Sequence, residues 1–218
     1  MKLKTLLLSF FVSLSLLFSS FASASTLVSP SSVDRANPEK VVTAAIDNTF
    51  FILNKYKGQI SSSNQALRTD IKTNVLPFFN IQYISLSLLN TYARSATKEQ
   101  LSEFSSVISD YMVNAYIEGL SFYTNETTSM GATTIQGKFA NTAVNINAKN
   151  TTYNIVFKMF NLNNNYGIVD FTAQGISLVG TKASEWQQIL RQSGVTGLTD
   201  YVRKNMNNIL NSYTDQAK

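Results

Sequence analysis

Apolar residues recur with helical spacing in several stretches of the first half of the chain. The first stretch follows Asn37-Pro38-Glu39, which is typical of a helix start because Asn can cap the first amides and Pro is tolerated at the first helical position. Apolar spacing predicts two further helices, over 67–75 and 81–92. The capping box Thr97-Lys98-Glu99-Gln100 begins the longest predicted helix, which extends from 98 to about 119.

After residue 121 the pattern changes from helical spacing to alternation, in a segment rich in Thr, Asn and Gly. Alternation places successive side chains on opposite faces of a strand. Two helices follow, a short one after Ser184 that ends at Gly194 and a last one over 198–213. Helices before and after a sheet predict an α+β fold with a small antiparallel sheet of about four strands. The predicted strands are 133–139, 142–148, 152–160 and 168–179, the last with a kink at Gly175.

The first 24 residues have the pattern of a secretory signal peptide. Lys2 and Lys4 precede an apolar run over 6–21, and Ala22-Ser23-Ala24 is a small-residue cleavage site. We expect cleavage after Ala24, export of the mature chain to the periplasm, a flexible lead-in over 25–36 and a single domain over 37–214. The alternative, a retained membrane anchor, would need a longer uninterrupted apolar run.

Composition narrows the possible functions. The chain has 18 basic and 13 acidic residues, without the clustered positive charge of a nucleic-acid binder. It has no Cys and no His, so it lacks a thiol nucleophile, a site for a lipid anchor, the commonest general base and the commonest metal ligand. We therefore expect a soluble protein that is not an enzyme and has no cofactor and no metal. Asp170, the one acid within an apolar strand, is interpreted as a hydrogen-bond anchor, with a general base as the alternative.

Two blocks of residues carry a resemblance to a known family. The earlier block consists of Pro77-Phe78-Phe79, Tyr92 to Arg94, Ala96-Thr97, Glu99-Gln100 and Phe104. The later block consists of Asp170, Gly175 to Val179, Ile189-Leu190, Gly194 and Leu198. Together they resemble the MlaC family, also called toluene-tolerance auxiliary proteins. The chain departs from the family pattern at Asn80, where Asp is common, at Tyr92 and Tyr166, where Trp is common, and at Thr181-Lys182-Ala183, where Asn-Tyr-Arg is usual.

The resemblance implies a periplasmic phospholipid carrier that helps to maintain outer-membrane lipid asymmetry. Its implied partners are an outer-membrane lipoprotein complex and an inner-membrane ABC transporter with an MCE-type subunit, at which a monomer would dock transiently. Two acyl chains have on the order of 30 methylenes, so exposing them to water would cost about 24 kcal/mol, and a carrier must enclose them. The alternatives are a binding module for another small hydrophobic ligand and, less favoured, a hydrolase that uses Asp170.

The positions of apolar stripes and strand faces, rather than the resemblance, predict the walls of a lipid pocket. Any one of these side chains has ordinary core packing as its alternative interpretation. The lipid head group is expected at the mouth of the pocket, beside Arg94, Lys138 or Lys158. The predicted wall residues are Phe50, Ile108, Tyr111, Met112, Tyr116, Ile155, Phe157, Met159, Ile168 and Ile176.

Overall fold

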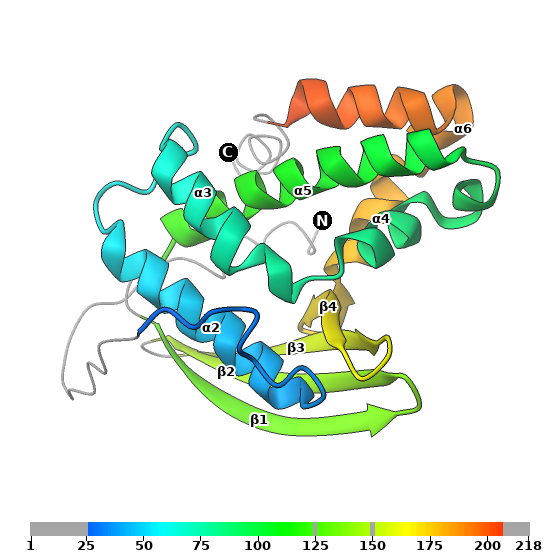
Figure 1. Cartoon of the computed structure of the whole chain (residues 1–218). Coiled ribbons are helices and arrows are strands. Elements are labelled where there is room, and N and C mark those ends of the chain that lie inside the picture. Colours follow the sequence, from blue (N-terminus) through cyan, green and yellow to red (C-terminus); the bar gives the residue numbers. More distant parts are fainter. Residues whose placement is uncertain (1–25, 124–125, 149–150, 207–218) are drawn as a thin grey trace.

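The computed structural model describes residues 26–123, 126–148 and 151–206, and the predicted signal peptide and its cleavage site lie outside these ranges. Helices precede and follow one antiparallel sheet, so the predicted α+β class is confirmed (Figure 1). The helices are α2 (Pro38–Lys55), α3 (Gln65–Asn74), α4 (Ile81–Leu89), α5 (Lys98–Ser121) and α6 (Leu178–Asn205), with short 3-10 helices η1 (Leu76–Phe78) and η2 (Asn90–Arg94). The strands are β1 (Thr127–Gln136), β2 (Phe139–Ala148), β3 (Thr151–Asn161), β4 (Tyr166–Ala173) and β5 (Ile176–Ser177).

Two helix starts follow the predicted capping residues. The Asn37 side chain accepts hydrogen bonds from the amides of Glu39 (3.0 Å) and Lys40 (3.2 Å) at the start of α2. Both hydrogen bonds of the capping box at Thr97 and Gln100 are present at the start of α5. Asn80 caps α4 by accepting from the Tyr83 amide at 2.9 Å, and an Asp at this position could make the same hydrogen bond.

The sheet has the order β1-β2-β3-β4-β5, with every neighbouring pair antiparallel. The fifth strand is a two-residue segment that follows the turn at Gly175, where φ is 78°. Gly175 therefore divides the last predicted strand as expected. Strand β1 begins at Thr127, earlier than predicted, because its register shifts between Met130 and Thr133 and interrupts the alternation there.

The sequence-based boundaries after β5 need correction. Leu178 and Val179 were expected to extend the last strand, but they form the first turn of α6. The cause is local, since the Ser177 hydroxyl accepts a hydrogen bond from the Gly180 amide at 2.8 Å and caps the helix. Gly194, with φ at 63°, kinks α6 instead of separating two helices, and the last predicted helix extends beyond the described residues.

The buried core is divided into three clusters. The first, around Phe104, joins α4, α5 and α6, which pack side by side, with α4 and the start of α6 also reaching strand β4 (Figure 1). The second, around Met159, joins the first half of α2 to the sheet, and the third, around Ile71, joins the second half of α2 to α3 and α5. Phe79, between η1 and α4, packs against all three clusters. A single domain usually has one contiguous core, so a division into three clusters is unusual.

Candidate ligand-binding site

A groove of about 510 Å³ opens where η1, the turn between β3 and β4 and the segment before α2 meet. This volume lies within the range of roughly 300 to 1,000 Å³ that is usual for small-molecule sites. The groove combines an apolar lining with two basic residues, Arg35 and Lys72. Its apolar lining comes from Leu76, Pro77, Phe79, Ile81 and Leu162. Such a surface suits a ligand that has both an apolar part and an anionic part.

Phe79 connects the groove to the interior. It lines the groove and also packs against each of the three core clusters. An apolar chain that enters the groove would therefore reach, at one side chain, the boundary shared by all three clusters. Burial along such boundaries would remove the chain from water without opening the centre of any one cluster.

The backbone on one side of the groove is held close to the sheet. The Asn80 amide donates to the Ile168 carbonyl at 2.8 Å, and Phe79 and Ile168 form a parallel bridge. A Cβ atom at Gly167 would lie 3.1 Å from the Cβ of Asn80, so a larger residue there would require Asn80 to shift by a few tenths of an ångström. This contact fixes Phe79 relative to β4.

Arg35 is anchored in the groove by backbone carbonyls. Its Nη1 donates to the Pro77 carbonyl at 2.8 Å, and its Nε and Nη2 donate to the Tyr166 carbonyl at 3.3 and 3.2 Å. The Tyr166 amide in turn donates to the Arg35 carbonyl at 2.8 Å. These bonds join η1 and β4 to a segment that we expected to be flexible.

The two basic residues of the groove differ in their charge environment. Lys72 forms an ion pair with Asp110 at 2.5 Å. Arg35 has no carboxylate partner among the residues that the structure describes, and burial lowers the pKa of its guanidinium. Because an Arg keeps its proton near neutral pH even so, the groove retains a positive charge that no described acidic side chain balances.

Half of the predicted wall residues lie in the buried core. Ile108 and Tyr111 belong to the first cluster, where the Tyr111 ring meets Trp186 edge-on at a centroid distance of 5.5 Å. Met159 and Ile168 are fully buried in the second cluster, and Ile155 is 6% exposed on the same face of the sheet. These five side chains have the ordinary core packing that was their alternative interpretation.

The other five predicted wall residues are only partly buried. Met112 packs against the first and third clusters, Phe157 against the second, and Phe50 and Tyr116 against the third. Ile176 lies in the same cross-strand row as Ile155. None of the ten predicted residues lines the groove, and all of them except Ile155 and Ile176 belong to or pack against one of the three clusters. Their contact with a ligand stays a prediction.

The three residues expected near a head group also lie outside the lining of the groove. Arg94 is exposed on η2, and Lys138 is exposed in the turn between β1 and β2. Lys158 is exposed, with its Nζ 4.9 Å from the centre of the Phe139 ring. Two residues that do line the groove, Arg35 and Phe79, were not among the predicted site residues. Phe79 was visible within the Pro77-Phe78-Phe79 block, but Arg35 stands in a segment without periodicity and gave no signal.

Asp170 acts as a structural anchor in this arrangement. Its carboxylate accepts hydrogen bonds from the Ser177 hydroxyl at 2.5 Å and from the Val179 amide at 3.1 Å. Both partners belong to the start of α6, so Asp170 fixes this helix to β4. Within the described ranges, no group of three or more acidic side chains could hold a metal ion, and no helix is long and apolar enough to span a membrane.

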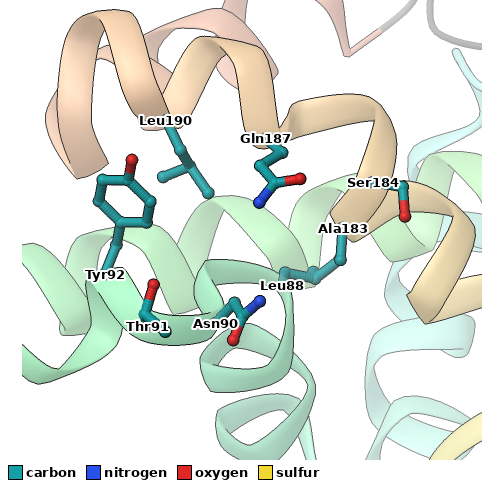
Figure 2. Close-up of a pocket in the computed structure, with 8 residues that line it drawn as sticks. All are labelled: Leu88, Asn90, Thr91, Tyr92, Ala183, Ser184, Gln187 and Leu190. Carbon is teal, nitrogen blue, oxygen red and sulfur yellow. The ribbon is translucent and has the colours of Figure 1, made fainter.

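A second, smaller pocket lies between α6 and the segment formed by α4 and η2 (Figure 2). Leu88, Asn90 and Tyr92 line it from one side, and Gln187 and Leu190 from the other (Figure 2). Its volume is about 70 Å³. That is far below the volume of a typical organic ligand site, so the pocket suits at most a few water molecules.

Tyr116 should make stability depend on pH in alkaline solution. Burial raises the pKa of its hydroxyl to about 12, and the hydroxyl is hydrogen-bonded to Thr49. An unfolded Tyr ionises near pH 10, so the stability associated with the protonated group is complete below pH 10 and is lost as pH rises towards 12. Between about pH 9 and 11.5, we expect wild type to lose roughly 2 kcal/mol more than Tyr116→Phe, measured by urea unfolding. Equal losses in the two proteins would show that the Tyr116 hydroxyl ionises as freely as in the unfolded chain.

Comparison with known proteins gives consistent matches. A family model described as "MlaC protein" matches residues 43–204, which is more than half of the chain. The chain is 23% identical over 184 residues to the intermembrane phospholipid transport system binding protein MlaC of Haemophilus influenzae, covering 82% of this chain and 86% of that protein. A solved structure of the phospholipid-binding protein from Ralstonia solanacearum, in complex with a phospholipid, matches with a TM-score of 0.66 and 15% identity, covering 80% of this chain and 97% of that one. At this identity, the structural likeness shows the fold alone.

Proposed function

The chain belongs to the MlaC family, and from this membership we propose that it is a periplasmic carrier that binds a diacyl phospholipid. The similar protein of Haemophilus influenzae is named as a binding protein of an intermembrane phospholipid transport system. The similar fold from Ralstonia solanacearum was solved with a phospholipid bound. The name of the Haemophilus influenzae protein supports binding and transport, rather than turnover, as the role of this chain.

The divided core is the observation that carries the proposal. A carrier must enclose acyl chains whose exposure to water would cost about 24 kcal/mol, yet it must also release them. A groove that meets three apolar clusters at Phe79 permits both enclosure and release, because the acyl chains can lie along the boundaries between the clusters. The partly buried side chains of Met112 and Phe157, at the edges of these clusters, are the proposed walls.

The proposed transport cycle follows from this physical balance. If the protein interior is as apolar as a bilayer, transfer of the tails from membrane to carrier is nearly neutral, and lipid can move in either direction at a docking site. We place one docking site at an outer-membrane lipoprotein complex and the other at an inner-membrane ABC transporter with an MCE-type subunit. The transporter would supply the energy. In this proposal residues 1–24 direct export and the domain over 37–214 carries the lipid.

Native mass spectrometry of the mature chain, purified under mild conditions from Ser25 onward, tests the proposal. We expect near-stoichiometric diacyl phospholipid, which organic extraction would release and identify. Protein that is purified free of lipid and also fails to extract phospholipid from vesicles would overturn the proposal. A different, smaller hydrophobic ligand in the extract would instead favour the alternative binding module.

A further inference from the structure

We propose that Arg35 forms a binding site for the phosphate of the lipid head group at the mouth of the groove. The inference rests on the proposed function, because it takes the groove to be the place where a phospholipid enters. It adds a residue and a chemical contact that neither the sequence pattern nor the family resemblance assigned.

The guanidinium of Arg35 is pre-positioned and still has donors to offer. Three of its hydrogen bonds go to the carbonyls of Pro77 and Tyr166. An Arg side chain has five N–H donors, so two remain after these contacts. The Arg35 guanidinium also lies 5.9 Å from the centre of the Phe78 ring, which further restricts its plane. A planar donor held in this way matches two oxygens of a phosphate.

The positive charge of Arg35 would be stabilised by an anion, and no acidic side chain in the described part of the protein pairs with it. The neighbouring acid, Asp34, is already paired with Lys40 at 3.1 Å. Carbonyl oxygens satisfy hydrogen bonds but carry no net negative charge, and partial burial makes an unbalanced cation costly. A bound phosphodiester would remove this cost. Lys72, on the same groove, is a weaker candidate because Asp110 already balances it.

The surroundings of Arg35 favour an amphiphile over a simple ion. The groove that contains this cation is also lined by Leu76, Phe79 and Ile81, and by Leu162, which is 54% exposed at the hairpin turn. A phosphate at Arg35 would therefore have apolar surface beside it and, at Phe79, access to the core. A purely structural role explains the three hydrogen bonds of Arg35 to carbonyls. It does not explain why the charge of Arg35 is unpaired or why the groove has an apolar lining.

The test compares two lipids with identical acyl chains, fluorescent phosphatidylglycerol and the corresponding diacylglycerol, which has no phosphate. Arg35→Gln should weaken binding of phosphatidylglycerol at least tenfold and leave binding of diacylglycerol unchanged. Arg191→Gln, which removes the same charge from an exposed site on α6, is the matched control and should change neither. Arg35→Lys keeps the charge but not the planar fork, so it should lose a smaller part of the affinity for phosphatidylglycerol. If Arg35→Gln fails to fold, the comparison of the two lipids is made with Arg35→Lys.

Several outcomes would overturn the proposal. Equal weakening of both lipids in the Arg35 variants would show a structural role only, and unchanged binding of both would show no role. Inorganic phosphate is the third probe, and its binding by wild type, lost in Arg35→Gln without any difference between the two lipids, would assign the site to a free anion. A wild-type protein that binds neither lipid would instead contradict the proposed carrier function itself.

Discussion

Replacing Phe157 with Asp is expected to abolish phospholipid binding while the protein stays folded. Phe157 lies on the face of β3 that also presents the buried Ile155 and Met159, and its ring lies 6.1 Å from that of Phe171. The side chain is only partly buried without a ligand, so the folded protein can keep an aspartate in contact with water. Lipid tails on this wall would bury the new carboxylate, at a cost of several kcal/mol. Affinity should therefore fall at least ~100-fold.

The adjacent residue provides a matched control. Val156 is also partly buried, but it points to the opposite face of the strand, in a cross-strand row with Ala143 and Thr172. Val156→Asp should keep its lipid, as detected by native mass spectrometry and vesicle extraction, with circular dichroism as the check on folding. Lipid retained by a folded Phe157→Asp protein would show that the inner face of β3 does not contact the ligand.

Replacing Asn48 with Ala is expected to reduce the free energy of unfolding by roughly 2 to 4 kcal/mol. The Asn48 side chain is fully buried on α2. Its amide nitrogen donates to the carbonyls of Val28 (2.8 Å) and Asn74 (2.7 Å), and its oxygen accepts from the Val28 amide at 2.8 Å. Alanine would leave these backbone groups without their partner and would free the segment before α2 from the helix.

A control on the same helix separates the loss of the Asn48 hydrogen bonds from the effect of replacing any Asn on α2 with Ala. Asn54 is exposed on the same helix, so Asn54→Ala should change the free energy of unfolding by less than about 0.5 kcal/mol. Urea unfolding of the three proteins gives the comparison. A loss for Asn48→Ala that is no larger than for Asn54→Ala would mean that water replaces all three hydrogen bonds.

Helix starts were predictable from the sequence because their chemistry is local. Asn37 and the pair Thr97 and Gln100 cap their own next turns, so the residues that decide the boundary stand within three positions of it. The start of α6 followed the same rule at Ser177. The start of α6 was not predicted because the apolar residues after Ser177 continue the strand pattern. Periodicity alone does not show where a strand ends and a helix begins.

The groove could not be predicted because none of its defining contacts is local. Arg35, Phe79 and Leu162 come from three segments far apart in the chain, and long-range hydrogen bonds bring those segments together. The apolar stripe on α5 was recognised, but spacing cannot tell a core residue such as Ile108 from a partly open one such as Met112. That distinction depends on which elements cover the helix.

The three-cluster core would also couple binding of the proposed lipid to the cooperativity of unfolding. Clusters that share few side chains, such as Phe79, can open separately at lower free energy than the whole domain. A lipid lying across their boundaries would add contacts to each cluster at once and bind only the assembled form. Loaded protein would then unfold as a single unit, whereas empty protein would behave as three loosely coupled ones. Under the proposed function, the protein would thus be most vulnerable to proteases after it releases its lipid, because the contacts that join the clusters are then lost.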